Sequence, residues 1–125
     1  GAAWLPSWLQ TMDAGCAAFK KGEARLQKLS LLPSEYARRQ LRVTPYSHEP
    51  TEWILNQSDP TMLLFSSDFP HVEGGRNPLK RFEDQLLNAA PASKDRFYRD
   101  NFIDLMGEGL ASHLRYSKSE AATQH

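Results

Sequence analysis

Several features of known protein classes are missing from this sequence of 125 residues. Its single cysteine, Cys16, cannot form a disulfide within the chain, and its apolar runs are far shorter than the roughly 20 residues that cross a bilayer. Fifteen basic and fifteen acidic residues cancel, so no long-range field attracts nucleic acid or an anionic membrane. These absences predict a cytoplasmic protein with no nucleic-acid partner and no membrane partner.

The first residues also lack the pattern of a secretory signal. Gly1-Ala2-Ala3-Trp4-Leu5-Pro6 has no basic region followed by an apolar core, and the sequence does not begin with methionine. A processed precursor, an engineered boundary or a piece of a longer protein would each give this start, and the sequence leaves the three open. The composition, 40% hydrophobic and 24% charged, is that of an ordinary globular domain.

Hydrophobic spacing predicts helices over most of the chain. Apolar residues recur at three- and four-residue intervals from Leu5 to about Leu26, which predicts an amphipathic helix interrupted near Gly15 or Gly22. Further helices are predicted at residues 32–40, at residues 51–56, from Pro78 onward, and, with Ser93 as the N-cap, near the C-terminus. The polar tail, residues 117–125, is predicted to be disordered.

Two short segments, residues 41–44 and 62–65, are predicted to be strands. The second is apolar at every position, which is typical of a parallel strand buried on both faces. Two such strands alone would leave main-chain groups unpaired at their outer edges. Either the chain is largely helical with weak strands, or the rest of the sheet comes from another chain or from sequence that is absent.

A carboxylate follows the second strand directly. The apolar run ends in Asp68, Pro70 and His71, at the position where parallel α/β folds keep their catalytic groups. Asp68 is therefore the first candidate for a catalytic residue. The alternative is a structural role, because aspartate before Phe-Pro is common in turns.

The motif around Asp68 resembles the last barrel strand of the amidohydrolase superfamily. It is most similar to the amidohydrolase-related branch that includes aminocarboxymuconate-semialdehyde decarboxylase-like enzymes. The resemblance covers roughly residues 1–107 and is carried by four segments in order: Gly1-Ala2-Ala3-Trp4-Leu5-Pro6 with Asp13, Pro33-Ser34-Glu35-Tyr36, Ser67-Asp68-Phe69-Pro70-His71, and Phe97-Tyr98-Arg99-Asp100-Asn101.

This resemblance implies the fold class α/β, with residues 1–116 as the C-terminal part of a metal-dependent (β/α)8 TIM barrel, predominantly helical with two short parallel strands. A complete barrel of this kind needs about 250 residues. Enzymes of the family bind a divalent metal, expected here to be zinc, through a His-x-His pair, two further histidines and the aspartate of the eighth strand. Only Asp68 matches such a position, and the four histidines here lack the family's spacing. No metal is expected on this chain alone.

Three other residues are candidates for substrate binding. His71 would line the site or bind a substrate carboxylate, although a solvent-facing loop histidine fits the sequence equally well. Trp4 lies in a loop that would border the site, and His48 follows the first strand. Glu49 is predicted to start a helix, and Gly74 and Gly75 to give the loop after Asp68 its flexibility. The predicted core includes Trp8, Cys16 and Phe19.

Two functions follow from these patterns. The first is a part of a metal-dependent hydrolase or non-oxidative decarboxylase (a lyase) that acts on a small carboxylated or cyclic substrate, with Asp68 as metal ligand and proton relay. The second is a catalytically inactive helical module that associates through exposed strands and apolar helix faces. The expected partners are a small-molecule substrate and either the missing N-terminal half of the barrel or another copy of the chain in a homo-oligomer.

Overall fold

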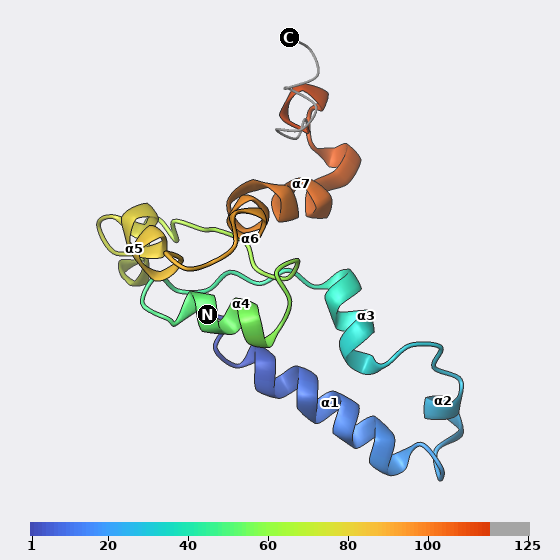
Figure 1. Cartoon of the computed structure of the whole chain (residues 1–125). Helices are drawn as coiled ribbons and strands as arrows, with labels where there is room; N and C mark the ends of the chain where they lie inside the picture. Colours follow the sequence, from blue (N-terminus) through green and yellow to red (C-terminus); the bar gives the residue numbers. More distant parts are fainter. Residues whose placement is uncertain (116–125) are drawn as a thin grey trace.

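The computed structural model describes residues 1–115 and consists mostly of helices joined by extended segments (Figure 1). The predicted tail, residues 117–125, lies outside the described residues. The helices of four or more residues are α1 (Leu5–Phe19), α2 (Ala24–Gln27), α3 (Pro33–Gln40), α4 (Thr51–Gln57), α5 (Pro78–Gln85), α6 (Pro91–Asp95), the π-helix η2 (Arg96–Asp100) and α7 (Asn101–Met106). The short 3-10 turns are η1 (Val72–Gly74), η3 (Gly107–Gly109) and η4 (Ser112–Leu114).

Three helices begin with a proline at their first position: α3 at Pro33, α5 at Pro78 and α6 at Pro91. Proline suits this position because its fixed φ is already helical and its missing N–H would have no partner there. The first two starts are confirmed. The predicted N-cap Ser93 is wrong, since the helix already begins at Pro91 and the Ser93 N–H donates to the Ala90 carbonyl oxygen.

The first predicted helix is two helices, because the chain leaves α1 after Phe19 and resumes a single turn at Ala24. Helices α1 and α3 pack together through a polar contact: a carboxylate oxygen of Asp13 accepts the Ser34 N–H at 2.9 Å. Hydrogen bonds from Ser34 lower the pKa of Asp13. Ser34 is buried at the start of α3, so the contact fixes where α3 begins against α1.

The predicted core on α1 is only partly correct. Cys16 is buried, as expected, but Trp8 is 37% exposed and Phe19 is 69% exposed. Helix α1 buries Leu5 and Leu9 on α3 and α4, and within residues 1–115 nothing covers the side that carries Phe19. The apolar stripe of α1 is therefore wider than the surface available to bury it.

The two predicted strands are reduced to one parallel bridge between Val43 and Leu63. Val43 donates its N–H to the Met62 carbonyl oxygen at 2.8 Å and accepts the Leu64 N–H at 2.9 Å. Met62, Leu63 and Leu64 are all buried, which confirms the expectation drawn from their unbroken apolar run. The chain is thus mostly helical with almost no strand.

The bridge lies across the middle of the molecule, with α1 and α3 on one side and α5, α6 and α7 on the other (Figure 1). Its residues share one hydrophobic core with side chains from α1, α3, α4, α5 and η2. Ring contacts join Phe65, Phe82 and Phe97, whose centroids are 5.1 to 6.3 Å apart. Phe82 and Phe97 are almost fully buried, so α5 and η2 are held to the bridge by aromatic packing.

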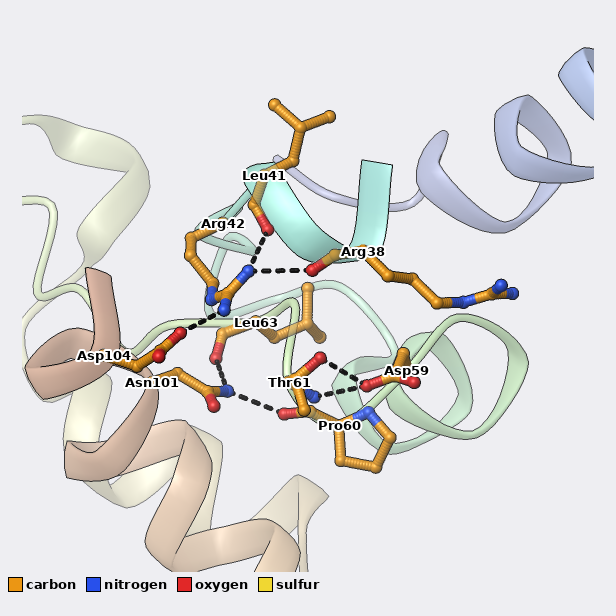
Figure 2. A network of polar contacts seen from close by, with 9 residues as sticks. All are labelled: Arg38, Leu41, Arg42, Asp59, Pro60, Thr61, Leu63, Asn101 and Asp104. Atoms are coloured by element: carbon orange, nitrogen blue, oxygen red, sulfur yellow. Dashed lines mark hydrogen bonds and ion pairs between the residues drawn. The ribbon is translucent and has the colours of Figure 1, made fainter. Parts of the chain in front are cut away.

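Asn101 ties the C-terminal helices to the second segment of the bridge (Figure 2). Its side-chain amide donates to the carbonyl oxygens of Pro60 at 2.6 Å and Leu63 at 2.9 Å, and only 1% of the residue is exposed. Beside it, the Phe65 N–H donates to the Phe97 carbonyl oxygen at 2.9 Å. Residues 97–101 therefore cover the outer edge of residues 62–65.

We expect Asn101→Ala to lower the free energy of unfolding by about 2 to 4 kcal/mol, because it removes two hydrogen bonds and leaves two acceptors unpaired. Urea denaturation of the two proteins measures the difference. Asn56→Ala, at an exposed position of α4, is the matched control and should change the free energy by less than about 0.5 kcal/mol. Equal effects of the two substitutions would contradict the anchoring role of Asn101.

Candidate functional site

Three loops lie together at the C-terminal end of the two paired segments, where Asp68 is found. They are residues 1–4, residues 44–50 and residues 66–77. The second and third loops follow the two paired segments, and because these segments are parallel their C-terminal ends point the same way. The first loop joins them through Glu49. The candidate site is the surface that these three loops form.

Glu49 holds the first two loops together. Its two carboxylate oxygens accept the Ala2 N–H at 3.1 and 2.9 Å, the Ala3 N–H at 3.0 Å and the Tyr46 N–H at 2.7 Å. Burial alone would raise the pKa of Glu49, but the amide hydrogen bonds outweigh it and the pKa is lowered. The predicted helix-start role of Glu49 is wrong: Pro50 is the N-cap of α4, and Glu49 instead binds main-chain groups 47 residues away in the sequence.

Asp68 lies in a tight turn. Its φ is +55°, an uncommon value for a residue other than glycine. The Asp68 N–H donates to the Ser66 hydroxyl oxygen at 3.2 Å, and the Asp68 carbonyl oxygen accepts the His71 N–H at 2.7 Å. No hydrogen bond involves the Asp68 carboxylate within residues 1–115, so both of its oxygens are available to a ligand.

Gly74 supports this turn from behind. It is buried, and a Cβ atom there would lie 2.2 Å from the Ser67 carbonyl oxygen and 3.2 Å from the Asp68 Cβ. The Ser47 hydroxyl donates to the Gly74 carbonyl oxygen at 3.4 Å, and Gln85 in turn donates to the Ser47 carbonyl oxygen at 2.7 Å. The expectation that Gly74 gives flexibility is therefore wrong: its lack of a side chain permits a close contact that fixes the Asp68 turn.

The side chains around Asp68 form a polar hollow of about 230 Å³. It is lined by Tyr46 from the second loop and by Asp68, His71 and Glu73 from the third. His48 stacks on Tyr46, with its ring centroid 5.4 Å from that of Tyr46 and an angle of 11° between the planes. Asp68 and His71, which the sequence singled out, thus lie in one hollow.

Trp4 does not line the hollow. Its indole N–H donates to the Gly1 carbonyl oxygen at 2.9 Å, its ring packs against Trp8, and 49% of the residue is exposed. His48 likewise contributes only through its stacking on Tyr46. Both belong to the loops that surround the site.

A larger hollow of about 360 Å³ lies between Phe65 and the C-terminal helices. Its lining is apolar apart from Tyr98 and Arg99. Burial, together with the Glu83 carboxylate nearby, raises the pKa of Tyr98, and Arg99 is paired with Asp100. Neither group is suited to exchange protons at neutral pH, so we place the candidate site at the smaller, polar hollow.

The described residues do not form a metal site by themselves. Among residues 1–115, no group of three or more histidine, cysteine, aspartate or glutamate side chains is arranged to hold an ion. Asp68 is a suitable oxygen ligand, but the remaining ligands would have to come from elsewhere. In the same part of the chain, no helix has the length and apolar character needed to span a bilayer.

The sequence indicates Asp68 as a candidate but does not indicate the residues that fix the loops around it. Gly74 could have been identified from the sequence, because glycine is often found where the backbone packs too closely against another group to leave room for a side chain. Glu49 and Gln85 gave no such signal, because their partners are main-chain groups far away in the sequence. Comparison with known proteins adds no relative: no family model, no curated protein and no solved structure matches this chain.

We expect Glu49→Gln to lower the free energy of unfolding at pH 7 by about 1 to 3 kcal/mol, because charged acceptors make the stronger hydrogen bonds. Since folding lowers the pKa of Glu49 below its ordinary 4.5, its contribution is complete above that pH and is lost as the pH falls through the folded value. Urea denaturation at pH 7 and in acid should therefore show the two proteins converging at low pH. Glu108→Gln, at an exposed position, should show no such convergence.

A pair of glycine substitutions tests the packing behind Asp68. Gly74→Ala should lower the free energy of unfolding by about 1 to 3 kcal/mol, because the new Cβ overlaps the Ser67 carbonyl oxygen. Gly15→Ala, in the interior of α1 with nothing within 4 Å of its new Cβ, should raise it by about 0.5 to 1 kcal/mol. Thermal or urea denaturation gives both values. A Gly74→Ala protein as stable as the parent chain would mean that the loop moves freely.

Proposed function

We propose that this chain is the C-terminal part of an amidohydrolase-like (β/α)8 barrel and supplies the Asp68 carboxylate to a divalent metal site, with zinc as the expected ion. The observation that carries the proposal is that Tyr46, which follows the first paired segment, lines the same hollow as Asp68 and His71, which follow the second. In a (β/α)8 barrel the loops after successive parallel strands form the active site in this way.

The chain's own residues have distinct parts in this proposal. Asp68 ligates the ion and exchanges a proton with the substrate, and its turn leaves both carboxylate oxygens accessible. His71, on the exposed rim of the same hollow, donates a hydrogen bond from its imidazole ring to a substrate carboxylate. Trp4 and His48 lie on the surrounding loops outside the lining of the hollow, and in this proposal they contact only the part of a small carboxylated or cyclic substrate that extends beyond it. When bound, a divalent ion supplies a water molecule with a pKa of about 7.

Both hydrolysis and non-oxidative decarboxylation are compatible with this role of Asp68. The two reactions share a metal ligand of this kind, and they differ in the contacts made to the substrate. Those contacts would come largely from the other barrel strands, which also supply the histidine ligands. We therefore propose a hydrolase or a decarboxylase and assign Asp68 to either.

In a complete barrel, the contacts at the outer side of residues 62–65 would have to change. A closed barrel requires a strand on each side of residues 62–65, and the outer side is covered here by Asn101 and Phe97. Closure would exchange the Phe97 contact for a main-chain contact with the first strand. The amide of Asn101 would remain bound to the Pro60 carbonyl oxygen.

The alternative function, an association module without catalysis, is favoured by a different observation. Large apolar side chains are unusually exposed: Val72 is 88% exposed, Phe69 is 85% exposed and Leu87 is 71% exposed. Exposed apolar surface of this extent marks interaction sites in many proteins. Two of these residues flank His71, so a partner could also cover the candidate site itself.

Replacing Asp68 tests the catalytic proposal in the complete parent enzyme. Asp68→Asn should lower turnover by at least about a hundredfold while the unfolding transition stays unchanged, because the amide is a poor ligand and cannot exchange the proton. Glu108→Gln, at an exposed position outside the hollow, is the control and should retain activity. Full activity of the Asp68→Asn enzyme would remove Asp68 from the mechanism, and stoichiometric zinc binding by the isolated chain at micromolar concentration would contradict a divided site.

A further inference from the structure

The two outer edges of the short sheet differ. Successive residues of an extended segment direct their main-chain groups to opposite sides. The Met62 carbonyl and the Leu64 N–H bind Val43, so Leu63 and Phe65 direct their main-chain groups outward, where Asn101 binds the Leu63 carbonyl oxygen and Phe97 binds the Phe65 N–H. This edge is closed.

The edge of the first segment is open. Val43 directs both of its main-chain groups to residues 62–64, so the groups of Arg42 and Thr44 point the other way. Within residues 1–115, the main-chain N–H and C=O groups of Arg42 and Thr44 make no hydrogen bond. Thr44 is exposed, and Pro45, which has no N–H, ends the edge.

The charge of the Arg42 side chain does not protect this edge from pairing with another chain. Its guanidinium donates to the carbonyl oxygens of Arg38 at 3.0 Å and Leu41 at 2.8 Å, and it forms an ion pair with Asp104 (Figure 2). Only 9% of the side chain is exposed, so its charge is already compensated within the chain. Natural edges are commonly protected by a projecting charge or a covering element, and this edge has neither within the described residues.

We propose that in this chain by itself the open edge, residues 42–44, which a neighbouring strand would occupy in a complete barrel, pairs with the same edge of a second copy to form a closed antiparallel dimer with a twofold axis at Val43. In that register Arg42 of each copy lies opposite Thr44 of the other, and the two residues exchange both hydrogen bonds. Four hydrogen bonds form, and they satisfy every unpaired group of Arg42 and Thr44 in both copies. The edge is self-complementary, as a twofold interface requires.

Apolar surface next to the edge adds to the interface. A hollow of about 300 Å³ lies between α1 and α3, and it includes Leu41, the residue before the edge, together with Trp8 and Met12. Trp8 and Leu41 are 37% and 36% exposed, so a second copy lying along the edge would cover apolar side chains that the chain leaves in water. The closed edge at residues 62–65 prevents further addition, so assembly stops at two copies.

Sedimentation of the full chain should show a monomer–dimer equilibrium and no larger species over roughly 10 to 200 micromolar, the range that detects a dissociation constant in the micromolar range. Amide hydrogen exchange of Arg42 and Thr44 should slow as the concentration rises. A monomer at every concentration, an open-ended series of oligomers, or a dimer in which exchange of Arg42 and Thr44 is unchanged would each overturn the proposal.

Two substitutions of one residue separate the edge from other surfaces. Thr44→Pro removes one N–H donor per copy, two of the four hydrogen bonds, and should raise the dissociation constant by at least about tenfold. Thr44→Val keeps the N–H and the branched shape, and its dissociation constant should remain within about threefold of the parent value. Circular dichroism shows whether both variants fold. If the Thr44→Pro protein does not fold, the hydrogen-exchange measurement on the unaltered chain still tests the proposal. Asp68→Asn should leave the equilibrium unchanged, so failure of the catalytic proposal and failure of this one are distinguishable.

Discussion

The two hydrogen bonds that Val43 makes with the segment 62–64 are the constraint on which the rest of the structure depends. They join two stretches of chain that neither contain a helix nor form a regular strand, and they bring α1 and α3 together with α5 and the C-terminal helices around one core. Because the pairing is parallel, the loops that follow both stretches emerge at one end. The position of Asp68 beside Tyr46 is a consequence of that polarity.

At this end the loops are held by contacts with main-chain groups. Glu49 binds the amides of Ala2, Ala3 and Tyr46, and Gly74 lies directly against the Ser67 carbonyl. Contacts of this kind fix the path of the backbone and leave the side chains of the hollow free to bind a ligand. The described part of the chain therefore has a well-supported rim around Asp68 without the complete set of ligands that a metal ion would need.

The sequence was sufficient for features that local chemistry decides. Pro33 and Pro78 start helices where predicted, and the apolar run before Asp68 is buried. Local rules failed where distant groups compete: Pro91 overrides Ser93 as the helix start, and Glu49 has main-chain partners that no spacing reveals. Trp8 and Phe19 have core-type spacing on α1, but residues 1–115 contain no layer to cover them. The predicted strands shrink to one bridge for the same reason, since strands need neighbours.

The π-helix η2 sets the closed edge through its hydrogen-bonding pattern. The Asn101 N–H reaches back to the Arg96 carbonyl oxygen, five residues earlier, whereas a regular α-helix would bind it to Phe97. The Phe97 carbonyl is thereby free to accept the Phe65 N–H. The extra residue in this turn also sets the angular phase of Asn101, that is, the direction around the helix axis in which its side chain faces the core. Loss or gain of a single residue between Pro91 and Asn101 would rotate that phase by about 100° and withdraw both contacts together. The number of residues in this stretch is consequently as constrained as their identity.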